Sequence, residues 1–178
     1  MPIPHLTTLC YIEKDGKYLM MHRIRKKNDI NHDKWVGIGG HFEEGESPEE
    51  CLVREVYEET GLRLVSYRFR GIVTFVSEES SGTSGDGTDV GGMDTEYMFL
   101  YTADDFLGQI PQGDVCNEGH LEWIDKKKVC DLPIWEGDKV FFRLLDDGKS
   151  GFSLKLRYLD GQLVTVTLDG ENVDFGKS

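Results

Sequence analysis

The sequence predicts a mixed α/β domain whose sheet contains both strand directions. Strand-like and helix-like segments alternate irregularly along the chain, and no internal repeat is present. The 178 residues fit one domain, 1–178, and leave room for a sizeable core. Hydrophobic residues make up 38% and charged residues 30% of the chain, which is typical of a folded protein.

The first elements are a hairpin and a loop. Residues 6–13 and 17–23 predict paired strands, and the turn between them carries Asp15-Gly16, a common hairpin sequence. Residues 24–34 are polar and predict a loop. Residues 35–40 form a compact, glycine-containing segment.

A helix is predicted over residues 48–60, where both ends carry clear signals. Ser47 is a favourable N-cap, Pro48 suits the first helical position, and Glu50 completes a capping box with Ser47. Gly61 is a natural C-terminal stop.

The remaining chain predicts further strands and one more helix. Residues 62–76 are mostly strand-like. Residues 77–92 contain five glycines and four serines and predict a flexible surface loop, because they offer little apolar surface to bury. The later expected elements are strands at 95–102 and 121–124, a helix at 138–145, and a hairpin of 152–158 with 163–168 around Asp160-Gly161. In the helix, Val140, Phe141 and Leu144 are expected on one apolar face.

The net charge of −13 limits the partners. A chain this acidic is a poor candidate for holding a DNA or RNA polymer, or an anionic membrane surface. If it handles phosphates, metal ions must bridge the two negative partners. We therefore expect no nucleic-acid polymer and no membrane as a partner. The protein is expected to be a monomer or a homodimer.

Localisation is predicted from the cysteines and the N-terminus. No apolar stretch approaches a membrane span, and no signal peptide is visible. Cys10, Cys51, Cys116 and Cys130 show no CxxC spacing, so we expect buried free thiols in a reducing cytoplasm and no zinc site.

Three carboxylates share one face of the predicted helix. At about 100° per residue, Glu59 and Glu58 fall near 40° and 300° from Glu55. Leu52, Val56 and Val53 form an adjacent apolar stripe. Such clustering of like charges is unfavourable unless a cation offsets it, and Mg²⁺ prefers oxygen ligands. The helix alone is equally consistent with a solvated acidic face.

The longer pattern around this helix resembles the Nudix box. Gly40, Glu46 and the run from Arg54 to Leu62 (REVYEETGL) match it at every defining position, so the box spans residues 40–62. The resemblance implies an α/β/α sandwich with a mixed sheet, and hydrolysis of nucleoside diphosphates linked to another group, using Mg²⁺ or Mn²⁺. It also implies that Glu55, Glu58, Glu59 and the Gly39 carbonyl bind metal, while Glu46 and Arg54 orient these ligands.

Two later segments also resemble members of this family. Glu118, within CNEGHLEW, resembles an extra active-site glutamate of MutT-like members and is a candidate ligand or base. The run LPIWEGD resembles the purine-binding segment of the oxidised purine nucleoside triphosphatases, with Trp135 stacking on the base and Asp138 hydrogen-bonding to it. Gly137 stands where that branch has a first aspartate, and Val36 where it has a base-contacting asparagine.

The resemblance implies a Mg²⁺-dependent pyrophosphohydrolase of purine nucleoside triphosphates such as 8-oxo-dGTP, with Gly40 and Val36 beside the substrate. Polar groups that face the purine edge determine which base is bound. Gly137 and Val36 lack such groups, so their presence argues against a strict specificity for 8-oxoguanine. Hydrolysis of ADP-ribose or another nucleoside diphosphate derivative is the alternative reaction. A non-catalytic nucleotide-binding module is the alternative from another class, and the intact box disfavours it.

Overall fold

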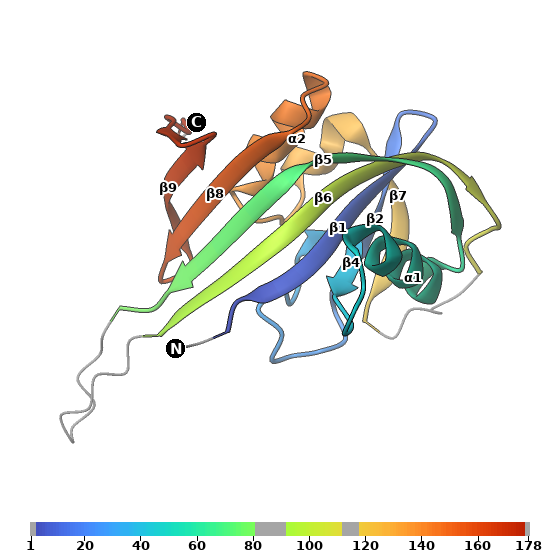
Figure 1. The fold of residues 1–178 in the computed structure, drawn as a ribbon, viewed down its shortest axis with the longest axis horizontal. Coiled ribbons are helices and arrows are strands. Elements are labelled where there is room, and N and C mark those ends of the chain that lie inside the picture. Colours follow the sequence, from blue (N-terminus) through green and yellow to red (C-terminus); the bar gives the residue numbers. More distant parts are fainter. Residues whose placement is uncertain (1–2, 81–91, 112–117, 177–178) are drawn as a thin grey trace.

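A computed structural model describes residues 3–80, 92–111 and 118–176. Within these ranges one mixed sheet holds ten strands, and eight of them follow the order β10-β9-β8-β5-β6-β1-β2-β3 (Figure 1). Off this path, β4 pairs with β1 and β7 pairs with β2. The strands are β1 (His5–Lys14), β2 (Lys17–His22), β3 (Trp35–Val36), β4 (Ile38–His41), β5 (Arg63–Glu78), β6 (Met93–Leu107), β7 (His120–Asp125), β8 (Phe152–Leu159), β9 (Gln162–Leu168) and β10 (Glu171–Asn172).

The sheet has both strand directions, as predicted. β1 runs parallel to β6, and β5 runs parallel to β8. The remaining pairs are antiparallel, including the two predicted hairpins. Both hairpin turns place an Asp-Gly pair at positive φ, with Asp15 at 50° and Gly16 at 73°, and this left-handed geometry suits a two-residue turn.

Helices cover both faces of the sheet. α1 (Pro48–Thr60) packs on β1 and β4, and α2 (Asp138–Asp146) lies behind the sheet with the 3₁₀ helix η1 (Lys126–Asp131) (Figure 1). Alternate side chains of strand β1 pack against the helices on the two faces of the sheet. Cys10 and Ile12 are buried in the cluster that contains the apolar side of α1, while Tyr11 is buried with Phe141 of α2. Side chains alternate across a strand, so the sandwich follows from this alternation.

The predicted bounds of α1 are confirmed, because its end signals are local. The Ser47 side chain accepts a hydrogen bond from the Glu50 N–H, and the Glu50 carboxylate accepts one from the Ser47 N–H. Gly61 ends the helix in the left-handed conformation. Leu52 and Val56 are buried as expected, but Val53 is 39% exposed, so the apolar stripe is narrower than predicted.

Several sequence expectations need correction. The strand expected to end at residue 76 continues to Glu78, because β6 and β8 both pair with this extension. The loop expected at 77–92 therefore starts later, and its residues 81–91 lie outside the described ranges. In α2 the buried apolar residues are Phe141, Phe142 and Leu145, whereas Val140 and Leu144 are only partly buried.

Among the cysteines, Cys10 and Cys51 are buried free thiols, as expected. Cys130 is exposed at η1, which corrects the expectation of burial, and Cys116 lies outside the described residues. In the part of the chain that the structure describes, no helix is long and apolar enough to cross a membrane.

Candidate active site

Arg54 gathers carboxylates from α1 and from the loop before it. Its Nε and Nη2 donate to the two Glu46 oxygens at 2.6 and 2.8 Å. Its Nη1 donates to Glu55 at 2.7 Å and to Glu58, which lies one helical turn after Arg54, at 3.2 Å. Nη2 also donates to the His41 carbonyl at 3.0 Å, which ties the network to the end of β4. The structure therefore brings together Glu46, Arg54, Glu55 and Glu58, as the sequence predicted.

Glu46 is held firmly in its ionised form. The forked hydrogen bonds from Arg54, and a further one from the Glu43 N–H at 2.8 Å, lower the pKa of Glu46 to about 2. A two-pronged guanidinium–carboxylate contact also fixes geometry, since both groups are planar. Glu46 thus fixes the Arg54 guanidinium, which in turn contacts the carboxylates of Glu55 and Glu58 on α1.

Glu59 is in a different environment from Glu58, although both lie on the same helix face. Its Oε2 is buried and lacks a hydrogen-bond partner among the described residues. Burial, together with the negative charges of Glu118 and Glu55, raises the pKa of Glu59 to about 8, although a hydrogen bond from the Gly39 N–H opposes the shift. A buried carboxylate oxygen without a donor needs a proton or a cation.

These carboxylates fit a divalent cation by their chemistry. Mg²⁺ takes oxygen ligands, and a cation between Glu55 and Glu59 would offset their repulsion and satisfy the buried Glu59 oxygen. Within the described residues, no three acidic, histidine or cysteine side chains are already arranged as a complete ligand set. Instead, Arg54 supplies the positive charge that Glu46, Glu55 and Glu58 contact.

Two glycines let β4 approach its neighbours closely. A Cβ on Gly39 would overlap the Thr8 carbonyl oxygen of β1, and one on Gly40 would lie 2.5 and 2.6 Å from the Glu55 carboxylate oxygens. Position 39 therefore requires glycine, because the obstacle there is backbone, whereas a Cβ at position 40 would force the Glu55 carboxylate to move. Gly40 thereby leaves the space that the Glu55 carboxylate occupies.

Glu118 reaches this site from a distant part of the chain. Its carboxylate accepts a hydrogen bond from Arg23 Nη1 at 2.8 Å and lies 3.5 Å from Lys26 Nζ. Arg23 is held in turn by Asp29 at 2.5 Å. Arg23 and Asp29 were not identified from the sequence as parts of this site. The only sequence feature that could have indicated their contact is their opposite charge within the polar segment after β2. Glu118 lies close enough to Glu59 for its negative charge to raise the Glu59 pKa.

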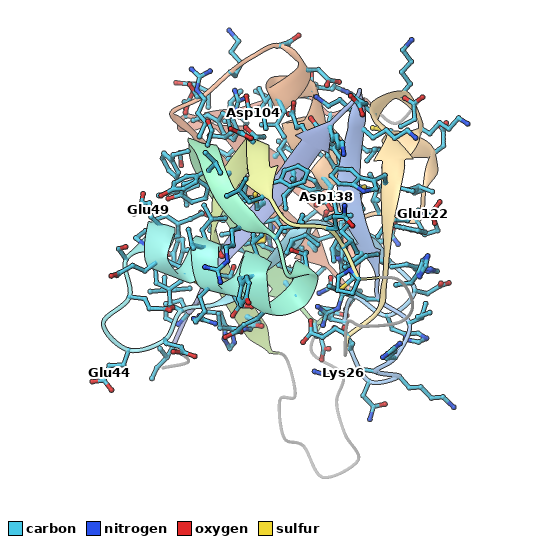
Figure 2. The ribbon with its side chains drawn as sticks, turned by 90° about the vertical axis from the view of Figure 1, so that its right-hand side faces the viewer. Lys26, Glu44, Glu49, Asp104, Glu122 and Asp138 are labelled. Carbon is cyan, nitrogen blue, oxygen red and sulfur yellow. The ribbon has the colours of Figure 1, made fainter. Side chains whose placement is uncertain are left out.

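The candidate base-binding residues form a second group at the start of α2. Trp135 is partly buried, contacts Phe75 and Tyr158 edge to face, and donates from Nε1 to the Asn31 side chain at 2.7 Å. Asp138 is buried, as the first residue of α2 (Figure 2). Val36 packs against the other cluster, on the α1 side, so the structure does not bring it together with Trp135 and Asp138.

Asp138 should make the protein less stable as the pH rises. Burial raises its pKa to about 8, although Lys34 opposes the shift, whereas an aspartate in the unfolded chain titrates near 4. The folded state therefore binds more protons between these values, and the free energy of unfolding falls by up to about 1.4 kcal/mol per pH unit from this group. Asp138→Asn should gain stability relative to the unmodified protein between pH 5 and pH 8, which urea unfolding at both pH values would measure.

A matched control for this experiment is Asp104→Asn, because Asp104 is exposed on β6 (Figure 2). That variant should keep the pH dependence of the unmodified protein. Equal stability differences at both pH values for Asp138→Asn would show that the buried carboxyl does not titrate in this range.

Comparisons with known proteins agree with this fold. The NUDIX domain family model matches residues 3–145, which is most of the chain, so the protein belongs to the Nudix family and is a Nudix hydrolase. Enzymes of this family generally use divalent metals such as Mg²⁺. The chain is 30% identical over 167 residues to the uncharacterized Nudix hydrolase YvcI of Bacillus subtilis, covering 93% of this chain and 95% of that protein.

Two further relatives point toward the MutT group. An oxidized purine nucleoside triphosphate hydrolase of Danio rerio is 26% identical, over 79% of this chain and 78% of its own length. The crystal structure of a MutT protein from Bacillus halodurans superposes with a TM-score of 0.75 at 27% identity, covering 94% of this chain and 99% of that one. Strands β8–β10 lie beyond the family match but join the same sheet through β5.

Proposed function

We propose that this Nudix hydrolase cleaves purine nucleoside triphosphates, including oxidised ones such as 8-oxo-dGTP, to the monophosphate and pyrophosphate with Mg²⁺. The observation that carries the proposal is the buried Glu59 oxygen of the Nudix box, which has no hydrogen-bond partner among the residues that the structure describes. Trp135 and Asp138 add a purine site, since an indole stacks on a base and a carboxyl hydrogen-bonds to its edge. The similarity to an oxidized purine nucleoside triphosphate hydrolase supports the same substrate class.

In this proposal, Glu55, Glu58 and Glu59 hold the metal with the Gly39 carbonyl and Glu118. Bound Mg²⁺ would supply neutralisation of the phosphate oxygens and a more acidic water. Arg54 and Glu46 are positioning residues, because they fix Glu55 and Glu58 by the hydrogen bonds described above. One of the site's glutamates accepts the proton of the attacking water, with Glu55, Glu58 and Glu118 as the candidates.

A substrate panel with Mg²⁺ tests this assignment. It compares 8-oxo-dGTP, dGTP, 2-oxo-dATP, dATP, a pyrimidine triphosphate, ADP-ribose and a dinucleoside polyphosphate by kcat/KM. We expect the highest values for purine triphosphates, with pyrophosphate as a product. Faster turnover of ADP-ribose than of every triphosphate would instead assign the protein to nucleoside diphosphate derivatives.

Asp138→Ala tests the purine site separately from the metal site. We expect kcat/KM for 8-oxo-dGTP to fall at least about tenfold more than that for a pyrimidine triphosphate, because only the purine loses its hydrogen-bond partner. The Mg²⁺ concentration for half-maximal rate should stay unchanged. Asp104→Ala is the control, and an equal loss on both substrates would make Asp138 a structural residue only.

A further inference from the structure

The segment before α2 leaves no room for a second carboxylate beside Asp138. The Gly137 N–H donates to the Tyr158 hydroxyl at 2.7 Å. A Cβ on Gly137 would lie 2.5 Å from Leu156 Cδ1 and 2.7 Å from the Tyr158 oxygen, both on β8. Position 137 is therefore filled by the Tyr158 hydroxyl rather than by a side chain of its own. Position 137 therefore adds no carboxylate to that of Asp138.

The Lys34 side chain places a positive charge beside Trp135. Lys34 Nζ lies 4.6 Å from the centre of the Trp135 ring, within the range of a cation–π contact. Its positive charge also favours the ionised form of Asp138. Lys34 thus contacts the ring proposed to stack on the base and lies near the carboxyl proposed to read its edge.

The backbone of Lys34 is held in place on both sides. Its carbonyl accepts from the Arg23 N–H at 3.0 Å, and its N–H donates to the Asn31 carbonyl at 2.9 Å. Asn31 also accepts the hydrogen bond from Trp135 Nε1. The next residue, Trp35, donates its N–H to the Pro133 carbonyl at 2.9 Å, which joins this segment to the one that carries Trp135.

We propose that Lys34 is a specificity-determining residue, which selects purines with a carbonyl oxygen at position 6 over purines with an amino group there. The inference rests on the proposed function. A lysine ammonium has only donors, so it pairs with the 6-carbonyl and opposes a 6-amino group, which is also a donor. Asp138 supplies the complementary acceptor for the neighbouring ring N–H of a 6-oxo purine, and a carboxyl keeps acceptor capacity in either protonation state.

The test compares substrates that differ at position 6. The ratios of kcat/KM for dGTP over dATP, and for 8-oxo-dGTP over 8-oxo-dATP, are measured for the unmodified protein, Lys34→Met and Lys27→Met. Methionine keeps the length of the lysine stem without its charge. Lys27 is an exposed lysine of the same loop and serves as the matched control. Binding of dGMP and dAMP by calorimetry, without metal, gives a readout that does not depend on turnover.

We expect the unmodified protein and Lys27→Met to favour the 6-oxo purines. Lys34→Met should reduce both kcat/KM ratios and the dGMP-over-dAMP binding ratio at least about tenfold, with an unchanged melting temperature. An equal loss on all substrates, or a preference for 6-amino purines in the unmodified protein, would overturn the role of Lys34 while leaving the proposed function intact. Absence of any triphosphate hydrolysis in the unmodified protein would instead overturn the proposed function.

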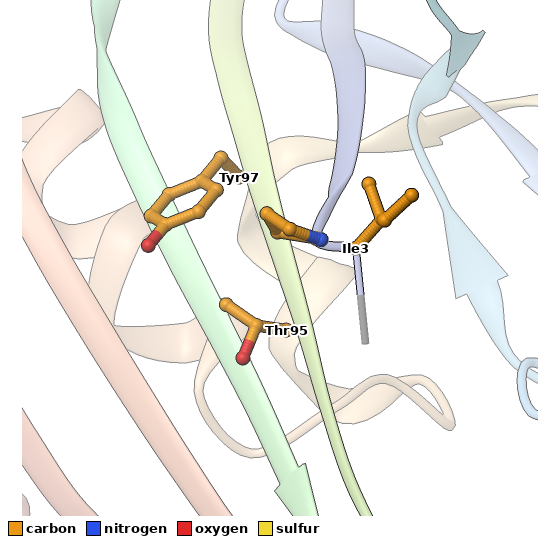
Figure 3. Close-up of a pocket in the computed structure, with 4 residues that line it drawn as sticks. Ile3, Thr95 and Tyr97 are labelled. Atoms are coloured by element: carbon orange, nitrogen blue, oxygen red, sulfur yellow. The ribbon is translucent and has the colours of Figure 1, made fainter. Parts of the chain in front are cut away.

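A hollow elsewhere in the structure carries no such chemistry. It lies near the start of β1 and β6 and is lined by Ile3, Pro4, Thr95 and Tyr97 (Figure 3). These four side chains offer no carboxylate, imidazole or amine to bind a phosphate or a metal, so the purine site remains the stronger candidate.

Discussion

Replacing Glu58 with glutamine should lower the rate of triphosphate hydrolysis at least about a hundredfold. Changes that only reorient metal ligands already cost about 10- to 100-fold, and this change removes a proposed ligand charge. Stability should change little, because the Glu58 side chain is 55% exposed and its contact is an ion pair with Arg54 at 3.2 Å. Initial rates over a Mg²⁺ titration, together with a thermal melt, measure both quantities.

The matched control for this variant is Glu44→Gln. Glu44 lies within the same box, but it extends into solvent from the turn before α1 (Figure 2). Its replacement removes the same charge and should leave the rate within about twofold, as expected for a surface substitution away from the site. Full activity of Glu58→Gln at limiting Mg²⁺ would exclude Glu58 from the metal site.

Adding one methyl group at Gly39 should destabilise the fold by about 3 kcal/mol. The new Cβ would overlap the Thr8 carbonyl oxygen, which belongs to the β1–β4 ladder and cannot move without breaking strand pairing. We expect a large loss of unfolding free energy in urea, or no folded protein at all. A melting temperature within two or three degrees of the unmodified protein would contradict this expectation.

Gly40→Ala is the informative counterpart, because its Cβ meets a side chain instead of the backbone. The Glu55 carboxylate must move aside, which is possible for a flexible side chain but displaces a proposed metal ligand. Activity should therefore fall at least about tenfold, as for loss of ligand orientation, while most stability is kept. The two variants separate the structural requirement at Gly39 from the catalytic one at Gly40.

The sequence by itself determined the features that depend on neighbouring residues. The capping box and Gly61 set both ends of α1, since each signal lies within one turn of the helix. The Asp-Gly pairs set both hairpins, because their turns need positive φ. The Nudix box placed its charged residues on one stretch of chain, so their proximity could be predicted without the fold. The prediction that the whole chain forms a single domain stays a prediction.

Only the tertiary structure decided which environment each of these residues has and which distant residues it contacts. Glu58 and Glu59 are adjacent in sequence, yet the Glu58 side chain is 55% exposed, whereas one Glu59 oxygen is buried and has no hydrogen-bond partner in the described part of the chain. The Arg23–Glu118 pair joins residues 95 positions apart, and the Gly137–Tyr158 hydrogen bond crosses from the start of α2 to β8. Such contacts form because the strands bring distant segments together, and their strength depends on burial. A short stretch of sequence contains neither kind of information, so these contacts could not be predicted from it.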